Sequence, residues 1–278
     1  MLLTVDVGNS QTVLATFDGD RRVDCWRVTT HSRATTDELQ LLWRGLLHDT
    51  DVTGVSACST VPALLPALRQ LLDRLAVPVT LIGPGVRTGV PLHVDNPREV
   101  GADRVVTALA AHERHGRAPD GSSRAVVVVD FGTSTNVDAV GPAGQFLGGA
   151  LAPGVEVSLD ALATRAAQLR SVELTVPAQA IGKNTVAALQ SGLVLGFAGL
   201  VDGLVGRIAE ELVAQFGTPP LVVATGGLHR LVVDSCRTIA ERDPDLTVHG
   251  LRLAFARHQA STHAGTAGQP GGRRPTGP

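Results

Sequence analysis

The chain has 278 residues, a formal net charge of −2 and 44% hydrophobic residues. This length allows one large or two medium domains, and the near-neutral charge offers no strongly basic surface for nucleic acid or an anionic membrane. No apolar run approaches the roughly 20 residues of a membrane helix, and strand-like sequence begins at once, so we expect neither a membrane span nor a signal peptide. Three widely spaced cysteines favour a reducing, cytoplasmic location.

The first half of the chain predicts strands followed by alternating helices and strands. Short extended runs with turn residues between them are typical of strands, and apolar residues at helical spacing predict helices. The expected elements are strands at 2–8, 12–20 and 21–30, a helix at 35–50, a strand at 52–60, a helix at 62–76, a strand at 77–83 and a helix from about Val100.

A polar stretch rich in glycine and proline at 116–124 predicts a linker. It separates an N-terminal half, 1–115, from a C-terminal half, 125–258. The second half predicts a strand, turn and strand at 125–140, helices at about 155–169 and 184–216, a strand at 219–227 and a helix at about 228–242. Residues 259–278 cannot bury apolar surface, so we expect a disordered tail.

One phrase occurs twice, as "LLTVDVGNSQTVLATF" from Leu2 and as "VVVVDFGTSTNVDAV" from Val126. Aligning Asp6 with Asp130 also aligns Gly8 with Gly132. A tight turn after a buried strand needs glycine where a ligand approaches the backbone, and N–H groups in such a turn can bind phosphate oxygens. The aspartate can hold a cation or orient a nucleophile. Two facing turns of this kind would grip one nucleotide triphosphate.

A P-loop is excluded as the source of phosphate binding. The only lysine, Lys183, is followed by Asn184, and Pro177 stands where the first glycine of the P-loop motif belongs. The histidines and cysteines show no spacing typical of a structural metal site.

The two Asp-x-Gly hairpins, followed late in the chain by "VVATGG", resemble the actin-like ATPase superfamily, which includes actin and the sugar kinases. This resemblance implies an α/β fold of two duplicated ribonuclease H-like halves with a nucleotide cleft between them. It also implies that Gly226 and Gly227 lie beside the adenosine of ATP.

Three further stretches, together with the late Gly-Gly turn, narrow the resemblance. "VDNPREVGADRVV" from Val94, "GGALAPGVEVSLDAL" from Gly148, "IGKNTVAALQSGLVLGFAGL" from Ile181 and "VVATGGL" from Val222 occur in the order found in type III pantothenate kinases. The similarity covers roughly residues 1–258. It implies ATP-dependent phosphorylation of pantothenate, the first step of coenzyme A biosynthesis, by a cytoplasmic homodimer that binds neither nucleic acid nor membranes.

The resemblance also implies roles for individual residues. Asp103 would be the general base that accepts the hydroxyl proton of pantothenate. Asp6 would hold Mg²⁺ through water, and Asp130 would bind a monovalent cation, K⁺ or NH₄⁺. The expected ATP-binding residues are Asp6, Val7, Gly8, Asn9, Ser10, Gln11, Thr12, Val13, Gly132, Thr133, Gly226 and Gly227. The expected pantothenate-binding residues are Gly101, Ala102, Asp103, Arg104 and Thr185, the last reaching the site of the neighbouring subunit.

Two positions depart from the family pattern. Asn136 replaces a threonine of the second phosphate turn, and Arg170 stands where proline is expected. They motivate an alternative, a non-catalytic nucleotide-binding accessory or regulatory relative on the same fold. The role of Lys183 stays open between structure and phosphate binding.

Overall fold

The computed structural model describes residues 1–83, 85–165 and 172–266. It contains two five-stranded mixed sheets, whose strand orders are β3-β2-β1-β4-β5 and β10-β9-β6-β7-β8. Each sheet begins with an antiparallel meander and then gains parallel strands, so β6 to β10 repeat the arrangement of β1 to β5. The duplicated phrase therefore corresponds to a duplicated topology.

The first sheet consists of β1 (Leu2–Val7), β2 (Gln11–Asp18), β3 (Arg21–Thr29), β4 (Gly54–Ser59) and β5 (Val79–Ile82). Helices α1 (Thr36–Leu46) and α2 (Leu65–Asp73) pack on one face, around Leu3, Val5 and Val7 of β1. Thr35 caps α1 in a capping box with Glu38. All these elements confirm the predictions for this half.

The second sheet consists of β6 (Val126–Phe131), β7 (Ser134–Val140), β8 (Phe146–Pro153), β9 (Leu221–Thr225) and β10 (Glu241–Arg242). Its outer face is covered by α4 (Val155–Arg165) and by a long helical segment. That segment runs through α5 (Thr185–Gln190), a π-helical turn (Ser191–Leu195) and α6 (Gly196–Phe216). Strand β8 was not predicted, because Gly148, Gly149 and Pro153 disfavour strands. The strand forms because its pairing with β7 overrides that preference.

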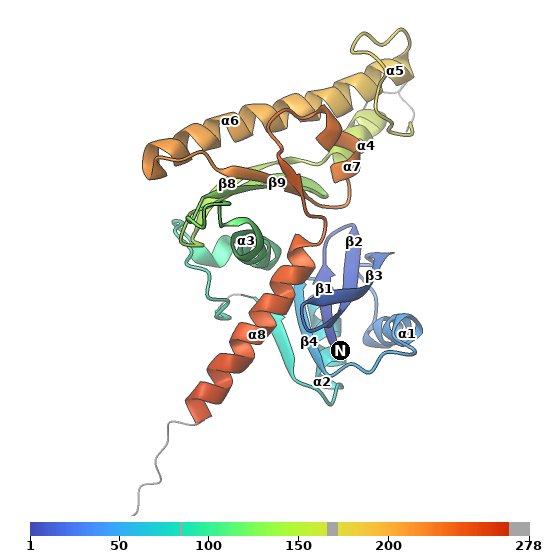
Figure 1. Cartoon of the computed structure of the whole chain (residues 1–278). Helices are drawn as coiled ribbons and strands as arrows, with labels where there is room; N and C mark the ends of the chain where they lie inside the picture. The colour runs from blue at the N-terminus through green and yellow to red at the C-terminus, as the bar shows by residue number, and fades with distance from the viewer. Residues whose placement is uncertain (84, 166–171, 267–278) are drawn as a thin grey trace, which may run out of the picture.

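Helices α3 (Ala102–His115) and α8 (Leu246–Thr266) lie between the two sheets (Figure 1). Alanines of α3, including Ala108 and Ala111, pack against Val126 and Val128 on the inner face of the second sheet. Helix α8 packs against the inner face of the first sheet, where Leu251 meets Cys58. The last helix therefore returns to the half in which the chain began, and α3 and α8 form the layer that separates the sheets.

Three predictions are corrected by the structure. The helix predicted over 228–242 is limited to α7 (His229–Val232) and a 3-10 turn (Val233–Ser235), because the Asp202 carboxylate accepts hydrogen bonds from the backbone N–H groups of Arg237 and Thr238 and holds them outside a helix. The chain then enters β10. The predicted disordered tail is helical as far as Thr266, because no proline or glycine interrupts 259–264.

The third correction concerns apolar runs. The helical segment Thr185–Phe216 spans 32 residues and is long and apolar enough, by length and composition, to cross a membrane. The segment contains many alanines and glycines and few charged residues, so it is apolar without a continuous run of large apolar side chains. Phe197, Val201 and Val205 pack one face of this helix into the core of the second sheet.

The crossing of α8 over α3 gives a stability prediction. A methyl group on Gly250 would overlap the Val106 carbonyl oxygen of α3, whereas one on Gly45 of α1 would meet open space. We expect Gly250→Ala to lower the free energy of unfolding by about 1–3 kcal/mol through overpacking, and Gly45→Ala to raise it slightly. Chemical denaturation of both variants tests this; equal effects would show that the helices separate without cost.

Candidate active site

The positions of Asp6 and Asp130 follow from strand alternation. Side chains of a strand point to opposite faces in turn. Leu3, Val5 and Val7 face the outer helices, so Asp6 faces the inner layer. In β6, Val127, Val129 and Phe131 face outward, so Asp130 also faces inward. The repeated phrase thus aims one carboxylate from each sheet at the space between the sheets.

The two Asp-x-Gly turns, one after Asp6 and one after Asp130, meet across this space. In the first turn Gly8 N–H donates to the Gln11 carbonyl at 3.0 Å, and in the second Gly132 N–H donates to the Ser134 carbonyl at 2.9 Å. The hydroxyls of Ser10 and Thr133, one from each turn, lie 2.8 Å apart. The facing arrangement predicted from the duplicated phrase is therefore present.

The Gly-Gly turn after β9 closes the same site. Gly226 has φ +91°, a left-handed conformation that favours glycine. A methyl group there would also overlap the Asp130 carboxylate and the Phe131 backbone. Glycine is thus required twice at this position, by its backbone conformation and by the close approach of Asp130.

One cavity joins these features. Most of the predicted site residues line it together with several that sequence reasoning missed. The lining residues are Asp6, Gly8, Asn9, Ser10, Gln11, Val13, Arg27, Thr60, Asp103, Asp130, Phe131, Gly132, Thr133, Ser134, Asn136, Glu156, Thr225, Gly226, Gly227, Leu228, Pro244, Asp245, Thr247 and Val248.

Three of the five acids that line the cavity, Asp6, Asp103 and Asp130, influence one another. Burial, followed by the charge of Asp103, raises the pKa of Asp6 to about 7. Burial and the charges of Asp103, Asp6 and Asp138 raise the pKa of Asp130 to about 7, against an opposing effect of Arg27. Burial also raises the pKa of Asp103. A cavity with so much buried negative charge favours a cation.

Asp103 occupies the first turn of α3, with Gly101 at the N-cap. The N-terminus of a helix stabilises a carboxylate, and here the backbone of Arg104 donates a hydrogen bond that lowers the pKa of Asp103 against the effect of burial. A carboxylate with a raised pKa, open to the cavity, suits the role of general base.

Arg104 does not line the cavity. Its guanidinium binds the buried Asp138 of β7 with Nε 3.1 and 3.2 Å from the two carboxylate oxygens and a further η-nitrogen contact. It also lies over the Phe146 ring, 5.3 Å from the centroid. The fork expected to bind pantothenate or phosphate is thus engaged by Asp138, which the sequence did not single out.

Other predicted residues lie away from the cavity. Val7 and Thr12 turn to the outer face of the first sheet, where Val7 is buried and the Thr12 hydroxyl lies 2.9 Å from that of Thr30. Gly101 and Ala102 form the start of α3 and do not line the cavity. Thr185 is exposed at the first position of α5, next to the exposed Lys183. Arg170 lies outside the described residues.

Comparisons with known proteins agree with this geometry. Residues 2–207 match the family of type III pantothenate kinases. The chain belongs to this family. A type III pantothenate kinase of Parafrankia sp. (strain EAN1pec) is 54% identical over 260 residues, covering 93% of this chain and 98% of the relative. The chain is therefore a kinase that phosphorylates pantothenate in coenzyme A biosynthesis, with ATP and pantothenate as its substrates.

Solved structures support the fold. A ROK hexokinase from Thermus thermophilus has a TM-score of 0.52 at 18% identity, covering 94% of this chain and 99% of that one. An inorganic polyphosphate/ATP-glucomannokinase from Arthrobacter sp. strain KM has a TM-score of 0.51 at 16% identity, covering 92% and 98%. At these identities the likeness concerns the fold alone, a two-lobed α/β kinase fold.

Two residues that no motif revealed act on the acids of the cavity, Arg27 as a lining residue and Cys58 from beneath the lining. Arg27 of β3 lowers the pKa of both Asp6 and Asp130 through its charge, and it stands opposite Val13 in the β2–β3 pair. Cys58 of β4 is fully buried and donates a thiol hydrogen bond to Asp6 at 3.3 Å. Only the strand register, which places Cys58 beside Asp6, could have signalled this contact.

The cavity of the kinase fits a divalent cation that arrives with a nucleotide. Among the described residues, no group of three or more histidine, cysteine, aspartate or glutamate side chains could hold a metal ion. Mg²⁺ is commonly bound by one or two carboxylates together with water and substrate phosphates. Asp6, buried with a raised pKa, matches that incomplete set of ligands, and Asp130 is left as a second buried carboxylate for a further cation.

Proposed function

We propose that this kinase binds ATP between its two phosphate turns and uses Asp103 as the general base toward the primary hydroxyl of pantothenate. The supporting observation is the convergence of Asp6, Asp103 and Asp130 on one cavity, lined by the glycine turns of both sheets. Phosphoryl transfer requires positioning, neutralisation of phosphate charge and an acceptor for the hydroxyl proton. We further propose that the sheets are duplicated ribonuclease H-like halves of an actin-like ATPase, with the nucleotide in the cleft between them.

The cations have separate roles in this proposal. Asp6 holds Mg²⁺ through water, and Asp130 holds a monovalent cation, K⁺ or NH₄⁺. Bound cations offset the negative charge that develops on the phosphates. Within the cavity the protein's own cation is Arg27, whose charge reaches both carboxylates. The exposed Lys183 lies outside the cavity lining and supplies no such charge within one chain.

We also propose a cytoplasmic homodimer in which Thr185 completes the neighbouring site. Thr185 does not line the cavity of its own chain. Large apolar side chains are exposed around α4, α5 and α6, as expected for a subunit interface; they are Val157, Leu162, Ile181, Val186 and Val213. These helices form the outer layer of the second sheet in Figure 1.

Subunit mixing tests this arrangement. In a heterodimer of one Asp103→Asn subunit and one Thr185→Val subunit, one site receives an intact Asp103 and an intact Thr185. We expect pantothenate-dependent ADP release, with Mg²⁺ and K⁺ present, to be low for each variant alone and to return when the two are mixed under subunit exchange. Sedimentation of each variant controls for assembly. A mixture as inactive as its parents, with heterodimers present, would contradict a shared site.

A further inference from the structure

The connection between β10 and α8 forms one wall of the ATP cavity. Pro244 and Asp245 of the connection line it together with Thr247 and Val248 of the first turn of α8. This connection also joins the two sheets, because β10 belongs to the second sheet and α8 packs on the first. It carries the one acidic side chain of this wall, Asp245, which the phosphoryl-transfer roles above leave unused.

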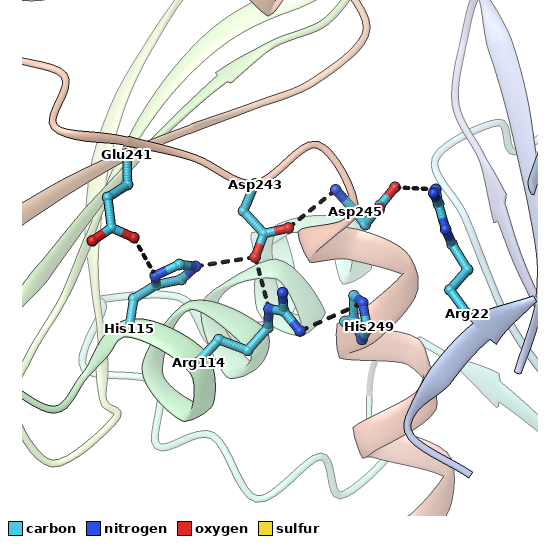
Figure 2. Close-up of polar contacts among 7 residues, drawn as sticks. All are labelled: Arg22, Arg114, His115, Glu241, Asp243, Asp245 and His249. Atoms are coloured by element: carbon cyan, nitrogen blue, oxygen red, sulfur yellow. Dashed lines mark hydrogen bonds and ion pairs between the residues drawn. The ribbon is translucent and has the colours of Figure 1, made fainter. Parts of the chain in front are cut away.

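A network of hydrogen bonds and ion pairs holds this connection against α3, on the side of Asp243 (Figure 2). The Asp243 side chain is only 6% exposed and accepts hydrogen bonds from Arg114 Nε at 2.7 Å and from the His115 ring at 3.0 Å. Although burial alone would raise it, these two partners lower the pKa of Asp243 to about 2. Asp243 therefore remains ionised and ties the connection to the C-terminal end of α3.

Asp245 is held in turn by three contacts. Its backbone N–H donates to Asp243 Oδ1 at 3.3 Å, and its carbonyl accepts from the backbone of His249 at 3.0 Å. Its Oδ1 accepts from Arg22 of β3 at 2.6 Å. Its second carboxylate oxygen has no hydrogen-bond partner within residues 1–83, 85–165 and 172–266, and the side chain is 20% exposed. Asp245 thus lines the cavity with one carboxylate oxygen held by Arg22 and one without a partner among the described residues.

Electrostatics decide which part of ATP this acceptor can meet. A carboxylate repels phosphate oxygens unless a cation lies between them, and Asp245 already has the Arg22 guanidinium as its counter-charge. We therefore place Asp245 away from the phosphates. It accepts hydrogen bonds from hydroxyl or amino groups, which only the nucleoside carries. Adenine presents a ring-nitrogen acceptor beside its amino group, and a carboxylate would repel that lone pair. The two adjacent ribose hydroxyls can both donate.

We propose that Asp245, oriented by Arg22 and Asp243, accepts a hydrogen bond from a ribose hydroxyl of ATP and makes the kinase select ribonucleotides over deoxyribonucleotides. This inference rests on the proposed ATP site. A hydrogen bond to a charged group contributes about 1.5–3 kcal/mol, so its loss should weaken nucleotide binding by roughly tenfold or more.

The test compares wild type with Asp245→Asn, which keeps an oxygen for Arg22 and converts the free acceptor into a donor. We expect wild type to show a KM about tenfold higher for 2′-deoxy-ATP or 3′-deoxy-ATP than for ATP. In Asp245→Asn the KM for ATP should rise to the deoxynucleotide value, while kcat and the KM for pantothenate stay within about twofold. Inosine triphosphate, which lacks the amino group, should respond to the variant as ATP does.

Two further variants separate this role from a general loss of structure. Asp234→Asn removes an exposed ion pair with Arg242 and should leave every nucleotide unaffected. Arg22→Gln removes the ion pair that orients the Asp245 side chain. It should weaken the binding of ATP more than the binding of 2′-deoxy-ATP or 3′-deoxy-ATP. Equal losses for ATP and both deoxynucleotides in Asp245→Asn, or unchanged discrimination, would overturn the proposal, as would an effect confined to ATP against inosine triphosphate. Equilibrium binding of the same nucleotides decides the matter even if pantothenate turnover fails.

Discussion

Replacing Asp103 with asparagine is expected to lower kcat by about 10²-fold or more while ATP still binds. General bases contribute about 10²–10⁴-fold to catalysis, and asparagine keeps the size of the side chain but cannot accept the hydroxyl proton. Asp103 lies in the first turn of α3 and lines the cavity with Asp6 and Asp130. Pantothenate-dependent ADP release and an ATP-binding titration measure the two properties separately.

The pH dependence gives a second signature of Asp103. Burial raises its pKa, and a base acts only when deprotonated, so activity should rise with pH through that raised pKa and then level off. Asp103→Asn should lose the contribution of Asp103 to this rising limb and keep the contribution of Asp6 and Asp130. Asp18→Asn, an exposed site at the end of β2 with a side chain 70% exposed, is the matched control and should keep the wild-type profile.

The outcome also separates the kinase from the accessory relative considered for this sequence. A loss of less than about threefold in Asp103→Asn would remove Asp103 from the chemistry. Retained ATP binding without pantothenate turnover in wild type would point to a protein that uses the nucleotide as a ligand. In that case Asn136, whose side chain accepts from the Ser134 hydroxyl at 2.9 Å inside the cavity, would be the first residue to restore to threonine.

Sequence patterns predicted the parts of this site that depend on local order. Alternation within two strands determines that Asp6 and Asp130 face inward. An Asp-x-Gly turn can be predicted from a few consecutive residues. Asp138 and Arg27 could not be predicted in this way. Each is an ordinary polar residue in its own strand, and each acquires its role only when α3 or the opposite sheet is packed against it.

The wrong helix at 228–242 has the same origin. "HRLVVDSC" is helical in pattern, but the carboxylate of Asp202, more than thirty residues earlier on α6, accepts the backbone hydrogen bonds that a helix would use. The displaced chain becomes β10 and the connection that carries Asp243 and Asp245. A long-range hydrogen bond that no local pattern records thus shapes a wall of the cavity that holds Asp6, Asp103 and Asp130.

Replacing Asp130 with asparagine should make the protein more stable at pH 8 and much less active. Asp130 has a folded pKa of about 7 against an ordinary 3.8, because it is buried near Asp103, Asp6 and Asp138, with only Arg27 opposing. A raised pKa means that the folded state binds the proton more tightly than the unfolded state. As pH rises from about 4 to about 7, ionisation therefore costs the folded protein stability, and above about 7 the full cost, a few kcal/mol, is present.

An asparagine side chain has nearly the same shape as that of Asp130 but does not ionise, so it carries no free-energy cost of a buried charge. Without nucleotide or divalent ions, the melting temperature of Asp130→Asn should exceed that of wild type at pH 8 and approach it at pH 4. Activation by K⁺ or NH₄⁺ should be lost, because the proposed monovalent-cation ligand has gone. Thermal unfolding at both pH values and ADP release across a K⁺ titration measure these effects.

Asp202→Asn provides a control of opposite sign. Burial alone would raise the pKa of Asp202, but hydrogen bonds from the backbone of Arg237, the side chain of Thr238 and the backbone of Thr238 lower it, so its ionised form stabilises the fold above the unfolded pKa of about 4. Its amide variant should melt below wild type at pH 8. If Asp130→Asn also melted lower, or differed from wild type equally at both pH values, the buried carboxylate would not be a site of stored electrostatic cost. A variant that stayed active and cation-dependent would show that the cation binds elsewhere. The expected pair, a gain in stability with a loss of activity, would show that Asp130 is kept ionised in the cavity for the cation it binds rather than for the fold.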